Sequence, residues 1–153
     1  MDPKVDICDL IKKGGVYYNV QGTTVSEVYK EICSQLSLPE NISTDLLYSE
    51  LIKREEMMST AVGNGIAIPH PRPLLLSKPE SQRIILCFPK QPLNMNAPDE
   101  RLVSALFILL TSSRQDHLAI LAKLADLVQK VAVRRVLEEQ ACEEDVLATL
   151  AQN

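Results

Sequence analysis

His70 is the residue of this sequence best placed to do chemistry, because its neighbours fix its backbone. It lies between Pro69 and Pro71, and a proline disfavours helical backbone for the residue before it. The imidazole is therefore expected on a stiff, extended stretch at the end of a short strand, where α/β proteins often carry functional side chains. Gly63 and Gly65 lie just upstream and permit a tight turn or a close backbone approach by a partner. A loop histidine without a function is the alternative.

Two further side chains have the chemistry to hold an anion. His117 falls at the start of a predicted helix, where unpaired backbone N–H groups and the helix dipole attract anions, and its ring can donate to a phosphoryl oxygen. Arg54 falls at the end of another predicted helix, and a guanidinium binds a phosphoryl group through two parallel hydrogen bonds. Taken singly, each has a simpler interpretation: a first-turn histidine that faces water and an ordinary surface arginine.

Hydrophobic periodicity predicts the elements that must position these residues. Strands are expected over residues 16–20, 63–70, 83–88 and 103–110. Helices are expected from Thr23 or Thr24 to Leu36, from Ser43 or Thr44 to Glu56, and over 131–139 and 143–151. A further long helix is expected to end at Val128 and to begin at a cap formed by Ser112, Ser113 or Asp116. Its buried residues are expected to be Leu118, Leu121, Leu124 and Leu127. Strands that are apolar throughout need cover on both faces. We therefore expect one α/β domain over residues 1–153, with helices on both faces of one sheet; the strand order does not follow from the pattern.

Composition excludes several other classes of protein. The 153 residues are 46% apolar and 24% charged, which is typical of a globular protein. A net charge of −4 argues against nucleic acid as a partner, and no apolar run is long enough to make the chain membrane-embedded. Residues 1–6 are acidic where a signal peptide would be basic, which predicts a cytoplasmic protein. Four cysteines lie far apart without a CxxC pair, so neither a disulfide framework, nor a metal, nor a cofactor is expected.

Residues 54–70 join these candidates in one continuous pattern. The stretch resembles the active-site signature of enzyme IIA proteins of the fructose/mannitol class in the bacterial phosphotransferase system, a class that includes nitrogen-regulatory enzyme IIA-like proteins. The signature runs R-E-x-x-x-S-T-x-x-G-x-G-[IV]-A-[IL]-P-H, and the sequence matches every fixed position. Residues 92–99, 103–110 and 117–124 follow the second half of the family pattern. The resemblance therefore covers nearly the whole chain.

The resemblance implies a role for each of these residues. His70 would be the phosphoryl acceptor, Arg54 and His117 would stabilise the phosphoryl group in the same pocket, and the sheet would be mixed. The transition state of phosphoryl transfer is loose and charge-dispersed, so alignment and electrostatic stabilisation supply most of the catalysis without a metal. Supporting positions, which either donate further hydrogen bonds or shape the turn and the helix end, are Glu55, Ser59, Thr60, Gly63 and Gly65.

The resemblance also implies partners: an HPr-type phosphocarrier as donor, and an enzyme IIB or a regulatory target as acceptor. Many family members have a small residue, often glycine, directly after the histidine, whereas Pro71 removes a backbone N–H that could donate to the phosphoryl group. Pro-His-Pro-Arg occurs in nitrogen-regulatory members, and no enzyme IIB or membrane IIC segment is fused in this sequence. We therefore favour a phosphorylation-dependent regulator over a sugar-transport enzyme IIA. A non-catalytic domain with a vestigial histidine is a third alternative, disfavoured because Arg54, His70 and His117 occur together.

Overall fold

The computed structural model describes residues 5–153, so most of the acidic start, residues 1–4, lies outside the described part. Helices and strands both occur along the chain, as predicted, but in runs of two or more after β1 and not in strict alternation. The elements are α1 (Ile7–Gly14), β1 (Val16–Val20), α2 (Val25–Gln35), α3 (Thr44–Met57), β2 (Ala61–Gly63), β3 (Ile66–Ala67), a 3₁₀ turn η1 (Pro79–Ser81), β4 (Arg83–Pro89), β5 (Ala105–Leu110), α4 (Arg114–Leu127), α5 (Val131–Glu138) and α6 (Glu143–Gln152). Within residues 5–153, no helix is both long and apolar enough to cross a bilayer.

The five strands form one mixed sheet in the order β1-β4-β5-β3-β2. The central strands β4 and β5 are antiparallel, with Ile85 opposite Ile108, whereas β1 runs parallel to β4 and β3 runs parallel to β5. All six residues of β5 are buried, as are all residues of β4 after its first. The sheet therefore needs cover on both faces, and the predicted layered α/β fold with a mixed sheet is confirmed.

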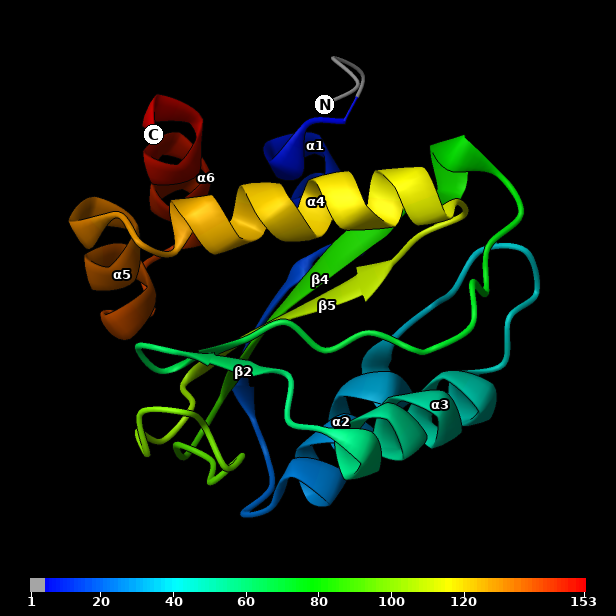
Figure 1. Ribbon diagram of the computed structural model, residues 1–153, viewed down its shortest axis with the longest axis horizontal. Coiled ribbons are helices and arrows are strands. Elements are labelled where there is room, and N and C mark those ends of the chain that lie inside the picture. The colour runs from blue at the N-terminus through cyan, green and yellow to red at the C-terminus, as the bar shows by residue number, and fades with distance from the viewer. Residues whose placement is uncertain (1–4) are drawn as a thin grey trace.

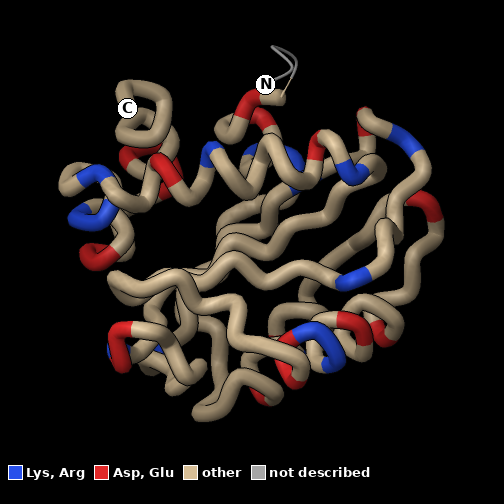
Figure 2. Tube along the Cα trace, viewed as in Figure 1, with Lys and Arg blue, Asp and Glu red and all other residues tan. Residues whose placement is uncertain are grey.

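Helices supply that cover in two layers (Figure 1). On one face α1, α4, α5 and α6 pack against alternate strand residues such as Leu86 and Phe107, and on the other α2 and α3 pack against Ile85 and Ile108. Charged residues belong mostly to the outer helices and loops, and the middle of the sheet is free of them (Figure 2). Helices α1 and α6, the first and last of the described elements, lie on the same side of the sheet as α4 (Figure 1).

Three details differ from the sequence prediction. Helix α1, capped by Asp6, was not predicted, although its apolar residues recur at helical spacing. The single strand expected over 63–70 is two short strands, β2 and β3, joined by a tight turn. Leu118, expected to be buried, is 54% exposed, because α4 packs on the sheet through Ile120, Leu124 and Leu127.

Candidate functional site

His70 follows β3 and lies on a segment that the sheet holds in place. The Ile68 amide donates to the Thr60 carbonyl at 3.0 Å, and the Leu109 amide of β5 donates to the Pro69 carbonyl at 2.9 Å. These two hydrogen bonds tie the extended stretch to Thr60 on one side and to β5 on the other, so the prolines are not the sole restraint on its backbone. His70 itself remains half-buried, with its ring at the surface of a pocket.

The protonation of the His70 ring follows from its hydrogen bond. Nδ1 lies 2.9 Å from the carbonyl oxygen of Ile68. A carbonyl oxygen can only accept, so Nδ1 carries the ring proton and Nε2 keeps a free lone pair. Burial lowers the pKa of His70 below its ordinary value, and Arg54 lowers it further, against the opposing effect of the Ile68 carbonyl. The ring is therefore neutral at pH 7, with Nε2 available as a nucleophile.

His117 lies beside this ring, in the first turn of α4. The two ring centroids are 4.8 Å apart and the rings are inclined at 64°. Helix α4 begins at Arg114 because the Ser113 hydroxyl caps it, accepting from the Asp116 amide at 3.1 Å. Burial, then His70 and Arg114, lower the pKa of His117 to about 4. His117 is thus a neutral hydrogen-bonding partner at pH 7 and is not free in water.

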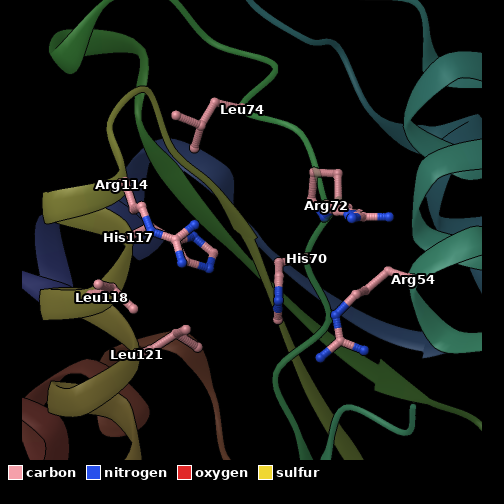
Figure 3. Close-up of a pocket in the computed structure, with 9 residues that line it drawn as sticks. Arg54, His70, Arg72, Leu74, Arg114, His117, Leu118 and Leu121 are labelled. Atoms are coloured by element: carbon pink, nitrogen blue, oxygen red, sulfur yellow. The ribbon is translucent and has the colours of Figure 1, made fainter. Parts of the chain in front are cut away.

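Arg54 approaches His70 from the opposite side, from the last turn of α3 (Figure 3). One of its terminal nitrogens, Nη1, donates to the Met58 carbonyl at 2.7 Å, which fixes the guanidinium near the end of the helix. A guanidinium has five N–H donors, so most remain free for a ligand. The structure therefore brings Arg54, His70 and His117 together around one pocket, as the sequence pattern implied.

This pocket has a volume of about 350 Å³, enough for a phosphoryl group, and none of its lining residues is acidic. It is lined by Arg54, His70, Pro71, Arg72, Leu74, Arg114, His117, Leu118 and Leu121. Arg72 and Arg114 had no predicted role. Arg72 follows His70 by two residues in the chain, whereas Arg114 is brought to the pocket by the fold and lies beside His117 (Figure 3). The excess of guanidinium groups favours an anionic ligand.

Glu55 and Thr60 support the site from behind, without lining the pocket. The Glu55 carboxylate accepts from the Thr60 amide and hydroxyl, both at 2.7 Å, and from the buried Tyr29 hydroxyl at 2.6 Å. Thr60 in turn accepts from Ile68, whose carbonyl holds the His70 ring. A continuous chain of hydrogen bonds therefore runs from Glu55 to the histidine.

The remaining predicted supporting residues shape the backbone. The Ser59 hydroxyl donates to the Met95 carbonyl and accepts from the Ala61 amide. Gly63 ends β2, and the turn to β3 consists of Asn64 (φ 58°) and Gly65 (φ 79°), which both adopt left-handed backbone, as a two-residue hairpin requires. The Asn64 amide donates to Asp99 at 2.8 Å. Of the two predicted alternatives, the structure thus favours turn geometry over direct donation for Ser59, Gly63 and Gly65.

Comparison with known proteins identifies the group to which this site belongs. The family model described as "Phosphoenolpyruvate-dependent sugar phosphotransferase system, EIIA 2" matches residues 9–153. The chain belongs to this family. Enzyme IIA proteins of this family are components of the phosphotransferase system, so phosphoryl transfer is the general activity in which the chain takes part.

Two relatives and two solved structures show which members of the family this enzyme IIA resembles. The chain is 31% identical to the nitrogen regulatory protein of Pseudomonas aeruginosa, over 82% of this chain and 81% of that protein. It is 30% identical to the fructose-specific EIIA component of Haloferax volcanii, over 71% of this chain and 70% of that protein. The crystal structure of nitrogen regulatory protein IIA-Ntr from Neisseria meningitidis superposes with a TM-score of 0.81 at 26% identity, covering 94% of this chain and 98% of that one. Mannitol IIA from Escherichia coli has the same fold (TM-score 0.69, 14% identity, 91% and 96% covered).

Truncating Glu55 is expected to destabilise this enzyme IIA. In Glu55→Ala, the Tyr29 hydroxyl and both Thr60 donors lose their acceptor. Each buried donor left unsatisfied costs about 1–3 kcal/mol, so urea unfolding should show a loss of more than about 2 kcal/mol. The exposed neighbour Glu56 provides the control, since Glu56→Ala should change stability by less than about 0.5 kcal/mol. Equal stabilities of the two variants would contradict this role of Glu55.

Acid is expected to destabilise the protein through His117. Its pKa is lowered from 6.5 to about 4 in the folded state, whereas the unfolded chain keeps the ordinary value. Between these values the unfolded state binds a proton that the folded state does not, so the free energy of unfolding falls as the pH is lowered through this window. Urea unfolding at about pH 7 and about pH 5 should show a smaller loss for His117→Gln than for the wild type. Equal losses would show that His117 titrates normally.

Proposed function

We propose that this enzyme IIA accepts a phosphoryl group on Nε2 of His70 from an HPr-type phosphocarrier, forming a phosphohistidine. The observation that carries the proposal is the hydrogen bond from Nδ1 to the Ile68 carbonyl, which leaves Nε2 as the free nitrogen. The pocket around it adds the cationic Arg54 and the neutral His117. The chain has two histidines, so His117 is the one other imidazole that could compete for the role.

The proposed transfer needs only these groups. The Nε2 lone pair attacks phosphorus, and the bond between phosphorus and the donor's nitrogen breaks, with its electron pair returning to the donor ring. Arg54 faces the negative charge that spreads over the phosphoryl oxygens in the transition state, and His117 donates a hydrogen bond to one of them. The proton on Nδ1 stays on the ring, held by Ile68. It withdraws electrons from the new N–P bond, which keeps the group ready for transfer onward.

We infer that the purpose of this chemistry is regulation, exerted on a target protein in the cytoplasm. Support comes from the similarity to nitrogen regulatory proteins and from Pro71, which lines the pocket where many family members carry a backbone N–H. A phosphoryl group adds up to two negative charges beside the exposed Leu74 and Leu118, and so changes which surface can dock there. The second candidate function is sugar transport through an enzyme IIB, which the fructose-specific relative supports.

Incubation with phosphoenolpyruvate, enzyme I and HPr tests the proposal. Intact mass should show the gain of one phosphoryl group that is lost in acid, as a phosphohistidine requires. A fructose- or mannitol-type enzyme IIB is then added: rapid transfer to it would favour transport, whereas retention of the group would favour regulation. A chain that gains no phosphoryl group would refute the phosphocarrier role and leave the non-catalytic interaction domain as the reading.

A further inference from the structure

His117 is held by a buried hydroxyl that belongs to neither helix nor strand. Thr111 directly follows β5 and is only 5% exposed. Its Oγ1 lies 3.1 Å from Nδ1 of His117. The two residues are six positions apart in the chain, so the contact spans the loop between β5 and the first turn of α4.

The direction of this hydrogen bond can be argued from the burial of Thr111. A hydroxyl has one proton and two lone pairs, and a buried proton without an acceptor is costly. Across residues 5–153, the contact with His117 is the one hydrogen bond that the Thr111 hydroxyl makes. The hydroxyl therefore donates to Nδ1, and Nδ1 accepts. A neutral imidazole that accepts at Nδ1 carries its proton on Nε2.

The loop that places Thr111 against His117 is itself fixed. Gln82, 4% exposed, accepts from the Ser112 amide at 2.9 Å and donates to the Asp116 carboxylate at 3.0 Å. The Ser113 hydroxyl caps the same turn. The Thr111–His117 contact is therefore built into a hydrogen-bonded loop and does not depend on a flexible surface side chain.

The two histidines consequently have opposite tautomers. His70 carries its proton on Nδ1 and offers a bare Nε2, whereas His117 carries its proton on Nε2. We propose that Thr111 is a positioning residue: it holds His117 as the Nε2–H tautomer, so that this N–H donates to the phosphoryl group on His70. Thr111 does not touch the phosphoryl group. The catalytic part of this inference rests on the proposed function, but the tautomer does not.

The first test is spectroscopic and uses the unmodified protein. The chain has two histidines, so a long-range ¹H–¹⁵N spectrum assigned with the His70→Asn variant resolves both rings. For His117 we expect a protonated Nε2 and an unprotonated Nδ1 that accepts a hydrogen bond. In Thr111→Val, the Nδ1 resonance should move towards that of a free imidazole nitrogen. A wild-type His117 protonated on Nδ1, or an unchanged resonance in Thr111→Val, would overturn the proposal.

The second test is kinetic and separates positioning from packing. Valine keeps the shape of threonine, so Thr111→Val should fold, and the rate of transfer from HPr should fall about tenfold, as for the loss of one hydrogen bond. Thr111→Ser, which keeps the hydroxyl, should restore most of the rate. Ser112→Ala removes the adjacent hydroxyl and should leave the rate unchanged. In a His117→Ala background, Thr111→Val should have no further effect; a full tenfold loss there would show that Thr111 acts otherwise.

The two tests fail separately. If the wild type gains no phosphoryl group, the proposed function is wrong, and the spectra alone decide the tautomer. If transfer occurs but His117 has the other tautomer, the proposed function stands and the role of Thr111 is refuted.

Discussion

The His70→Asn protein is expected to gain no phosphoryl group from enzyme I, HPr and phosphoenolpyruvate. Asparagine places an amide N–H near the position of Nδ1, so the hydrogen bond to the Ile68 carbonyl can be kept. It supplies no basic nitrogen in place of Nε2, and an amide nitrogen is not a nucleophile. The loss should therefore be complete while the fold persists. Intact mass after incubation measures the gain of a phosphoryl group, and urea unfolding measures whether the fold persists.

His117→Asn is the matched control for this variant. It removes the other imidazole of the pocket, whose assigned role is stabilisation, so its transfer should be slower than wild type but measurable. Incorporation that persists in His70→Asn would refute His70 as the acceptor. Complete loss in His117→Asn, with retention in His70→Asn, would reverse the two roles.

Replacing Arg54 by alanine is expected to slow phosphoryl transfer about a hundredfold, the usual effect of removing one preorganised donor to transition-state charge. The guanidinium contacts the end of its own helix through the Met58 carbonyl, and its other donors remain free in the pocket. Stability should change little, because the side chain is not buried in the core. Arg54→Lys keeps the charge but loses the planar fork, so its loss should be intermediate. Single-turnover transfer from phosphorylated HPr measures the rates.

The preceding residue provides the control. Lys53 is exposed, lies on the same helix and makes an ion pair with Glu50 at 3.5 Å. Lys53→Ala removes one positive charge beside Arg54, so it tests for a general effect of charge and should leave the rate within about twofold of wild type. Equal losses in Lys53→Ala and Arg54→Ala would show that net charge, and not the guanidinium in the pocket, governs transfer.

Local features of the fold could be predicted from the sequence because they depend on nearby residues. The apolar runs of β4 and β5 and the caps at Thr24, Ser43 and Ser113 are such features. Helix α1 was missed although Asp6 is a cap and Ile7, Leu10 and Ile11 have helical spacing; eight residues give only a weak periodic signal. The sheet order was not predictable, because it depends on which distant strands pair.

In the candidate site, too, residues within a local sequence pattern could be predicted, whereas residues brought together by the fold could not. Residues 54–70 carry a continuous pattern, so Arg54 and His70 could be identified together, and His117 followed from the family pattern. Arg114 could not, because its approach to His70 is a consequence of the fold; Arg72, two residues after His70, was near in the sequence but had no assigned role. Leu118 was assigned to the core because α4 has apolar residues on more than one face. The Asn64-Gly65 dipeptide was the available signal for the hairpin, since both residues tolerate left-handed backbone.

The two exposed leucines at the mouth of the pocket also bear on how long a phosphoryl group would remain on His70. Leu74 and Leu118 line the pocket and are 48% and 54% exposed, so this side of the pocket is open to water in the free protein. If His70 carries the proposed phosphoryl group, water can reach that group from this side, and we expect hydrolysis to limit its lifetime. A partner that covers the two leucines excludes water while the group is handed over. The phosphorylated state is therefore expected to decay by hydrolysis unless the phosphoryl group is first transferred to a partner.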